Sequence, residues 1–152
     1  MTPTLFSLKC EDCGGIFTAV LANTGSYGEL ILYSRAGNAA WLNALEDPVF
    51  DEVTELVKAH PDAGKLDDVD QATVLHAVFS VACDPDPEHH RYVIGGMPPC
   101  PNCKSQKIES WEPVGALPAE RSIPHVTHAW WNGLSPEEKR STVHQAIDHY
   151  LL

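Results

Sequence analysis

The sequence lacks the segments that would place the protein in a membrane or mark it for export. No apolar run approaches the roughly 20 residues that a helix needs to cross a bilayer. Residues 1–13 (MTPTLFSLKCEDC) have neither the basic start nor the long apolar centre of a signal peptide. We therefore expect a cytoplasmic protein with no membrane partner. Cysteine is also scarce, at five in 152 residues, but a chain of this length can bury a core without several disulfides.

The sequence also lacks the short motifs that mark common catalytic and nucleotide-binding sites. It contains no H-E-x-x-H, no Gly-rich phosphate loop, no G-x-S-x-G and no Ser-Asp-His arrangement. Asp51 and Glu55 are four residues apart and could act as a carboxylate pair, but a solvated helix face is the simpler interpretation of this spacing. We therefore expect that the protein is not an enzyme.

Positive charge is scarce as well, and the negative charge is concentrated in one segment. The chain has 10 Lys and Arg against 21 Asp and Glu, a formal net charge of -11. Residues 46–88 hold twelve acids and only two bases, Lys58 and Lys65, so this segment carries -10 of that charge. Such a segment repels phosphate backbones and attracts basic partners. The alternative is a solvated acidic surface that only keeps the protein soluble.

Four of the five cysteines form two Cys-x-x-Cys pairs that lie far apart in the sequence. The first pair is Cys10 and Cys13 in CEDC, and the second is Cys100 and Cys103 in CPNC. Four thiolates are what a tetrahedral zinc site requires, and paired cysteines in a reducing cytoplasm hold metal more often than they form disulfides. Iron can use the same ligand set. A redox dithiol is a further alternative, although neither pair is placed to open a helix in a βαβ pattern.

The two pairs and their apolar, β-branched flanks resemble the zinc ribbon, a rubredoxin-like arrangement of two hairpin knuckles that each offer a cysteine pair. Gly14 follows the first pair, where a positive φ angle is often required. Lys104 stands at the matching position of the second knuckle, where glycine is common, so the second knuckle departs from the usual pattern. The resemblance implies a structural zinc ion bound by all four cysteines. It does not imply one function, because ribbons occur in proteins of many kinds.

We predict one α+β domain over residues 1–152, built on a split ribbon. The ribbon halves are expected at 4–22 and 91–114, with a mostly helical acidic insertion at 24–90 and C-terminal helices at 124–152. The ribbon would be a small antiparallel sheet, with the insertion between its two knuckles.

Individual patterns predict the elements of the insertion and of the C-terminal segment. Residues 28–34 favour a strand, residues 38–45 a short helix, and residues 47–60 a helix with Asp47 as N-cap and Pro48 in the first turn. A second helical pattern runs from about Val69 to Cys83, with either Asp67 or Asp70 as its N-cap. Its buried face is expected at Ala72, Leu75, Val78, Phe79 and Ala82. The C-terminal segment contains a short helical stretch at 126–133 and then a helix that opens with a capping box of Ser135 and Glu138. The buried stripe of this last helix is expected at Val143, Ala146, Ile147, Tyr150 and Leu151.

Several residues outside the cysteine pairs can be interpreted either as purely structural residues or as functional ones. His125 and His128 are spaced i, i+3 and could form a second metal site with a nearby acid. Trp130 and Trp131 are adjacent, so one can pack in the core while the other is exposed as an anchor for a partner. Cys83 is either a small buried hydrophobe or a nucleophile assisted by His76. In each case the structural interpretation, as an ordinary core or surface side chain, is the simpler one.

These observations favour a non-enzymatic, zinc-stabilised module whose acidic face binds a basic protein. One concrete form is an immunity or inhibitor protein that blocks a basic toxin or nuclease. The alternative is a nucleic-acid- or transcription-associated ribbon, because basic residues gather around the knuckles at Lys9, Arg91, Lys104 and Lys107. Acidic residues are interleaved with these bases, so the patch is not clearly positive. The sequence leaves the partner and the oligomeric state open.

Overall fold

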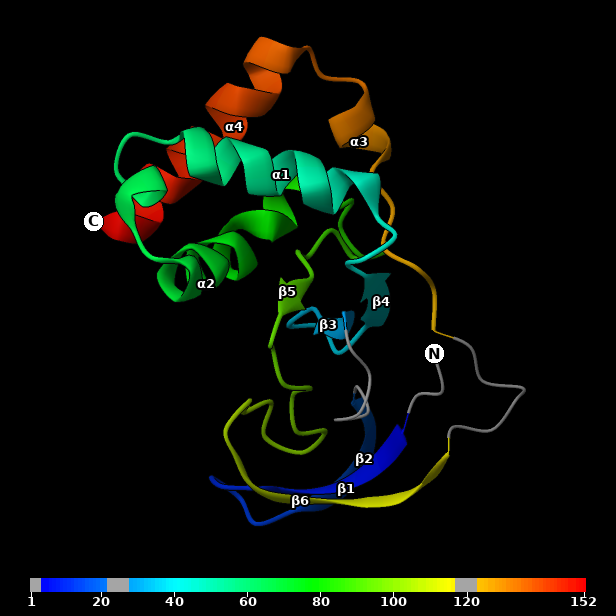
Figure 1. Cartoon of the computed structure of the whole chain (residues 1–152). Helices are drawn as coiled ribbons and strands as arrows, with labels where there is room; N and C mark the ends of the chain where they lie inside the picture. The colour runs from blue at the N-terminus through cyan, green and yellow to red at the C-terminus, as the bar shows by residue number, and fades with distance from the viewer. Residues whose placement is uncertain (1–3, 22–27, 117–122) are drawn as a thin grey trace.

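The computed structural model describes residues 4–21, 28–116 and 123–152, and it has the predicted α+β character. Two antiparallel sheets, each of three strands, are combined with helices in the described part of the chain. Figure 1 shows three levels: one sheet at the bottom, the second sheet in the middle and the helices at the top. The predicted first ribbon half ended at Ala22 and the predicted insertion began at residue 24, and both of these boundaries lie outside the described residues.

The lower sheet, here called the ribbon sheet, has the strand order β2-β1-β6. Its strands are β1 (Thr4–Cys10), β2 (Ile16–Leu21) and β6 (Ile108–Ala116). Alternate residues of β1 (Phe6, Leu8 and Cys10) are buried, as expected for a strand with one covered face. Segments from the two ends of the long intervening sequence therefore meet in one sheet, because β1 pairs with β6 from Thr4 to Cys10.

The upper sheet, here called the second sheet, has the order β4-β3-β5 and corrects the prediction of a mostly helical insertion. Its strands are β3 (Glu29–Tyr33), β4 (Ala39–Asn43) and β5 (Val93–Ile94). The prediction of a strand near 28–34 is confirmed, whereas the prediction of a helix at 38–45 is wrong. Ala40 and Leu42 alternate with less buried neighbours and pair with β3, so cross-strand pairing overrides a local pattern that also fits a helix.

The strand before the second cysteine pair belongs to this second sheet. Ile94 pairs with Leu32 and Val93 pairs with Tyr33, so β5 lies against β3 and not against β6. The prediction that residues 91–114 would form a complete ribbon half was wrong in this respect. Only β6, after the second pair, joins the ribbon sheet.

The helices begin at the predicted caps. Helix α1 (Pro48–Ala59) starts at Asp47, whose side chain accepts hydrogen bonds from the backbone N–H groups of Val49 and Phe50. Helix α2 (Asp68–Val78) starts at Asp67 and continues into a short 3-10 helix, η2 (Phe79–Ala82). A second short 3-10 helix, η1 (Ala63–Lys65), separates α1 from α2.

The C-terminal segment contains a short helix and a long one. These are α3 (Ala129–Asn132) and α4 (Pro136–Leu151). The capping box at the start of α4 is confirmed: Ser135 Oγ accepts from the Glu138 N–H, and the Glu138 side chain accepts from the Ser135 N–H. Val143 and Ile147 form the buried stripe of α4, whereas Tyr150 and Leu151, predicted to belong to it, are 46% and 43% exposed.

The largest hydrophobic core joins the helices to the second sheet and includes no buried residue of β1, β2 or β6. Its members come from β3, β4, the helices and the loops that connect them: Leu32, Ala40, Leu42, Val49, Val53, Val57, Ala63, Val74, Leu75, Val78, Phe79, Ala82, Cys83, Tyr92, Trp131, Val143 and Ile147. The ribbon sheet thus depends on a different, small set of buried side chains and on the contacts between the two cysteine knuckles. Within the described residues, no helix combines the length and the apolar character needed to cross a bilayer.

Candidate metal centre

The two cysteine pairs form knuckles with the same hydrogen-bond pattern. In the first, the Cys10 N–H donates to Gly15 O at 2.9 Å and the Gly14 N–H donates to Cys10 O at 3.0 Å. In the second, the Cys100 N–H donates to Ser105 O at 2.8 Å and the Lys104 N–H donates to Cys100 O at 2.9 Å. Each turn therefore aims its two sulfur atoms to the same side, as the resemblance to a ribbon implies.

The residue after each pair adopts the left-handed backbone conformation. Gly14 has a φ of 73° and Lys104 has a φ of 64°. Glycine tolerates this conformation, whereas a residue with a Cβ is strained by roughly 1–2 kcal/mol. The departure at Lys104 therefore leaves the geometry of the second knuckle unchanged and adds strain to it.

The fold brings all four sulfurs together. The Sγ atoms of Cys10, Cys13, Cys100 and Cys103 lie within 4.8 Å of one another. Across the two knuckles, Cys10 and Cys103 are 3.5 Å apart, and so are Cys13 and Cys100. A tetrahedron with metal–sulfur bonds of about 2.3 Å has edges of about 3.8 Å. The spacing therefore fits a metal ion bound by four thiolates.

Side-chain and backbone contacts fix one knuckle against the other. The Glu11 N–H donates to Lys107 O at 2.9 Å, and the Ser105 hydroxyl donates to an Asp12 carboxylate oxygen at 2.6 Å. Gly15 lies at the junction, where an added Cβ would come within 2.9 Å of Asn102 Nδ2 and 3.3 Å of Cys13 Sγ. A side chain at this position would therefore crowd the sulfur cluster.

Backbone N–H groups and neighbouring sulfurs shift the thiol pKa values in opposite directions. Hydrogen bonding from the Cys103 N–H, assisted by the Asn102 N–H, lowers the pKa of Cys100 to about 7. The Ser105 N–H acts in the same direction on Cys103, but the adjacent sulfurs outweigh it and raise the pKa of Cys103 to about 12. Four thiols crowded into this space cannot all ionise unless a cation compensates the charge, which is what a divalent metal supplies.

The four cysteines of the candidate metal centre differ in their exposure to solvent. Cys10 and Cys100 are buried, whereas Cys13 and Cys103 are exposed. Four protein ligands fill a tetrahedral site and leave no position for water or substrate, which is typical of structural zinc sites. Both pairs lie in turns, so the helix-opening geometry of a thioredoxin-like dithiol is not present.

The two candidate histidines do not form a second metal site. His128 Nδ1 lies 2.7 Å from Ala82 O and its Nε2 lies 2.7 Å from Asp47 Oδ2, and His125 packs against the Trp41 ring with centroids 4.0 Å apart. In the part of the chain that the structure describes, the four cysteines are the only cluster with the spacing of metal ligands. His128 thus ties the start of α1 to the end of η2.

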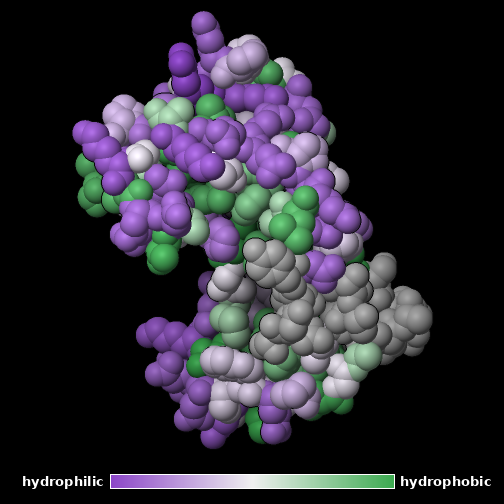
Figure 2. Space-filling view, viewed as in Figure 1, coloured by the Kyte–Doolittle hydropathy of each residue, from purple (hydrophilic) through white to green (hydrophobic). Residues whose placement is uncertain are grey.

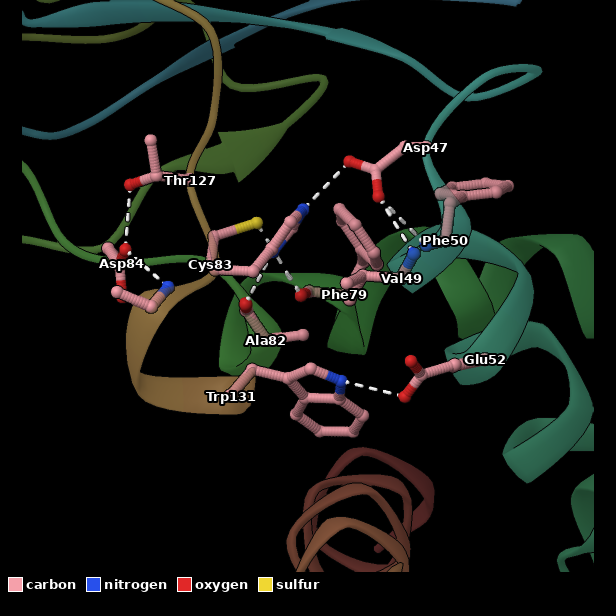
Figure 3. Close-up of polar contacts among 12 residues, drawn as sticks. Asp47, Val49, Phe50, Glu52, Phe79, Ala82, Cys83, Asp84, Thr127 and Trp131 are labelled. Carbon is pink, nitrogen blue, oxygen red and sulfur yellow. Dashed lines mark hydrogen bonds and ion pairs between the residues drawn. The ribbon is translucent and has the colours of Figure 1, made fainter. Parts of the chain in front are cut away.

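The two tryptophans differ in their environment. Trp131 is fully buried and its indole N–H donates to Glu52 Oε2 at 3.0 Å, as Figure 3 shows. The same carboxylate oxygen accepts a hydrogen bond from Lys139 Nζ at 3.0 Å, so Glu52 connects α1 with α3 and α4. Trp130 is 55% exposed.

The environment of Cys83 fits a small buried hydrophobic residue better than a nucleophile. It is buried, its thiol approaches Phe79 O at 3.8 Å (Figure 3), and burial together with the charges of Asp47 and Asp84 raises its pKa to about 12. A thiol with such a pKa stays protonated and unreactive at neutral pH.

The structure also brings together residues that the sequence patterns did not indicate. Asp86 is buried and accepts hydrogen bonds from Ser34, from Asn38 and from the N–H groups of Glu88 and His90. Burial alone would raise the pKa of Asp86, but these four hydrogen bonds outweigh burial and hold the pKa well below the ordinary value. The acid-rich loop at 84–90 concealed this role, because nothing in the local sequence distinguishes the buried Asp86 from the half-buried Asp84 or the exposed Glu88.

Comparison with known proteins adds no family assignment. No protein-family model, no curated protein and no solved structure matches the chain. The functional interpretation therefore depends on the sulfur cluster and on the surfaces of this molecule alone.

Proposed function

We propose that this protein is a non-enzymatic binding module in which a structural zinc ion, held by Cys10, Cys13, Cys100 and Cys103, fixes the ribbon sheet. The convergence of four sulfurs within 4.8 Å carries the metal part of this proposal. Zinc is favoured over iron because nothing in the surroundings of the cluster points to electron transfer. Bound zinc supplies a permanent cross-link between the two knuckles, and the energy of its binding becomes folding energy.

In the second part of the proposal, the acidic helical face binds a basic protein. Support comes from exposed acids that lie on α1, on α2 and on the loop between them: Asp51, Glu55, Asp62, Asp67, Asp68 and Asp70. Figure 2 shows mainly hydrophilic residues over the helical part of the molecule on the face that it displays. Such a surface speeds association with a positively charged partner and resists nucleic acid.

The outer face of α2 gives this surface an apolar centre. Val74, Leu75 and Val78 face the core, whereas Val69, which is 74% exposed, Ala72, Thr73 and Ala77 face solvent. Ala72 was expected in the buried stripe, so this is a correction of the sequence prediction. A helix that is apolar on two faces is typical of one that is covered on both. Asp68 and Asp70 border the exposed face and favour a partner that combines basic and apolar side chains.

A narrower form of the proposal is an immunity or inhibitor protein that neutralises a basic toxin or nuclease. Its support is the small size, the net charge of -11 and the absence of catalytic motifs in the sequence. Inhibition of a co-purifying basic enzyme by the pure protein tests this form directly, and a partner with no activity to inhibit argues against it.

Metal analysis of the purified protein and of single variants tests the zinc site. We expect one zinc per chain, lost when any of the four cysteines becomes serine. Cys83→Ser is the matched control, because it makes the same chemical change at a cysteine outside the cluster and should keep the metal. A metal-free preparation with normal stability would contradict the proposal.

Charge reversal on α1 tests the acidic surface. The double variant Asp51→Lys, Glu55→Lys should weaken capture of the basic partner, because it changes the charge by four units on one helix face. Glu52 must be left intact, since it holds Trp131 and Lys139 and its reversal would disturb the core. The exposed Glu112 on the ribbon sheet provides a control, Glu112→Lys, that should leave capture unchanged.

The alternative, a nucleic-acid-associated ribbon, has weaker support. Lys9 forms an ion pair with Glu109 at 3.0 Å, so one of the four bases near the knuckles is already neutralised. Filter binding at low salt distinguishes the two proposals: micromolar affinity with a steep salt dependence would favour nucleic acid over a basic protein.

A further inference from the structure

A hollow of about 580 Å³ lies between β5 of the second sheet and the loop that leads to the second knuckle. It is lined by Tyr33, Arg35, Arg91, Val93, Gly95, Gly96, Met97 and Gln106. The volume is within the range of about 300–1,000 Å³ that is typical of small-molecule sites. In Figure 2 the surface is hollowed between the helical part and the ribbon sheet, on the side where β5 lies in Figure 1.

The charge of this hollow is opposite to that of the molecule. Two of the four arginines of the chain line it, and no acidic residue does, although the chain as a whole carries -11. Within the described residues neither Arg35 nor Arg91 forms an ion pair with a carboxylate. Two guanidinium groups without a carboxylate partner on one hollow form a local positive site on an acidic protein.

The neighbouring groups define the shape of the site. Arg35 Nε donates to His90 Nδ1 at 3.2 Å, which orients one guanidinium while leaving its terminal nitrogens available. Gln106 Nε2 donates to Met97 O at 2.9 Å and so closes the wall toward the knuckle. Gly95 has a φ of 76°, and a Cβ at Gly96 would come within 3.3 Å of Val93 O, so both glycines keep the floor free of side chains.

We propose that this hollow binds a small molecule that carries a phosphate or carboxylate group beside an apolar body. Guanidinium groups match planar or tetrahedral oxyanions through paired N–H donors, which lysine cannot do. Tyr33, Val93 and Met97 supply apolar surface next to the arginines. The site is independent of the acidic face on α1 and α2, so the two binding functions can be tested separately.

Titration of the zinc-loaded protein with phenyl phosphate and with benzoate, followed by amide and arginine Nε NMR signals, tests this site. We expect saturable shifts at residues 91–97 and at the Arg35 Nε signal, with benzyl alcohol as a neutral control that causes none. Comparison of the affinities for phenyl phosphate and for benzoate shows whether the site prefers a phosphate or a carboxylate group. Either oxyanion supports the proposal.

Arg35→Gln and Arg91→Gln should each weaken binding about tenfold or more, because each removes a charge-assisted hydrogen bond. Arg140→Gln, at an exposed arginine on α4, is the matched control and should bind as the wild type does. Zinc content is measured for every variant, so loss of the ribbon cannot be mistaken for loss of the anion site.

Three results would overturn the proposal. The first is an absence of saturable shifts at millimolar probe, and the second is binding by both arginine variants that is as tight as that of the wild type. The third is a single-stranded oligonucleotide that binds more tightly than phenyl phosphate and loses affinity when Lys104 and Lys107 are replaced. The last result would assign the positive charge to a nucleic-acid surface.

Discussion

At the scale of single residues, the two knuckles differ most in the side chain that follows each cysteine pair. Gly14 and Lys104 have nearly the same φ, 73° and 64°, and the same backbone hydrogen bond to the first cysteine of their pair. The second knuckle thus adopts its geometry against the preference of its own residue. Backbone pairing and the sulfur cluster impose a conformation that lysine does not favour.

Replacing Lys104 by glycine should therefore stabilise the zinc-loaded protein. The left-handed conformation costs roughly 1–2 kcal/mol for a residue with a Cβ, and the greater freedom of glycine in the unfolded chain offsets part of that gain, so we expect a free energy of unfolding higher by about 0.5–1 kcal/mol. Urea unfolding of the zinc-loaded variant measures the change. Lys104→Ala is the control, since it removes the same charge but keeps the Cβ. Equal stabilities of the glycine and alanine variants would show that the strain is absent.

The contacts of Glu52 assign it a structural role that the sequence does not indicate. In the sequence it is one acid among twelve between residues 46 and 88. In the structure its carboxylate accepts hydrogen bonds from the buried Trp131 indole and from Lys139, whose ammonium also lies 5.5 Å from the centre of the Trp131 ring. Glu52 therefore holds core and helix side chains in place from the edge of the core, with its own side chain 42% exposed, and the candidate binding acids are those around it that make no such contacts.

At the scale of elements, Asp86 joins the hairpin of β3 and β4 to the loop that precedes β5. Ser34 and Asn38, on either side of the hairpin turn, donate to one carboxylate oxygen, and the N–H groups of Glu88 and His90 donate to the other. These hydrogen bonds favour the ionised form and lower the pKa of Asp86. The short strand β5 is thereby held next to β3.

The stabilisation by Asp86 should depend on pH. Because the folded-state pKa is lower than the ordinary value near 3.9, the contribution is fully present above about pH 4 and is lost as the pH falls toward the folded-state pKa. The difference in free energy of unfolding between the wild type and Asp86→Asn should therefore be largest near neutral pH and shrink in acid. Urea unfolding at pH 6 and at lower pH measures it.

Asp62→Asn serves as the control for this measurement, because the exposed Asp62 carboxylate accepts no hydrogen bond within the described residues. All three proteins keep the same cysteine cluster, so any effect of acid on that cluster is common to them and the comparison isolates Asp86. A difference that stays constant with pH would mean that Asp86 contributes through shape and not through its charge.

At the scale of the whole molecule, the protein has two sets of buried side chains, joined by the Tyr33 hydroxyl of β3, which accepts from the Val20 N–H and donates to Val20 O on β2. The large core unites the helices with the second sheet, whereas the ribbon sheet has its own buried residues on β1 and the sulfur cluster at its end. Figure 1 shows the ribbon sheet at the opposite end of the molecule from the helices, with the second sheet between them. The proposed zinc ion therefore stabilises one end of the molecule directly.

Removal of the metal by a chelator should loosen the ribbon sheet before the helical part. Amide hydrogen exchange should show lost protection in β1, β2 and β6, with most protection retained in α1, α2 and α4, because the large core contains no residue of the ribbon strands. The helical signal in far-UV circular dichroism should fall little. Cooperative loss of the helical signal together with the ribbon amides would show that the two cores are one unit.

The sequence predicted those features that depend on local chemistry. The caps at Asp47, Asp67 and Ser135 fix where α1, α2 and α4 begin, and the turn at each cysteine pair follows from its spacing. The proximity of the four cysteines was inferred from ligand number, because two pairs alone leave a metal half-bound. These predictions hold because a cap, a turn or a ligand set is specified by a few residues that are close in sequence or identical in chemistry.

The tertiary structure decided what depends on partners far away in the chain. The segment 38–45 became β4 because it pairs with β3, and residues 93–94 joined β3 and not β6. Burial also separated Trp131 from Trp130, and the hydrogen bonds of Glu52 separated it from its acidic neighbours. The fold likewise brought Arg35 and Arg91 to one hollow across 56 positions of sequence. Short segments can satisfy their backbone hydrogen bonds as helix or as strand, and only the neighbours that the fold provides determine which arrangement has the lower free energy.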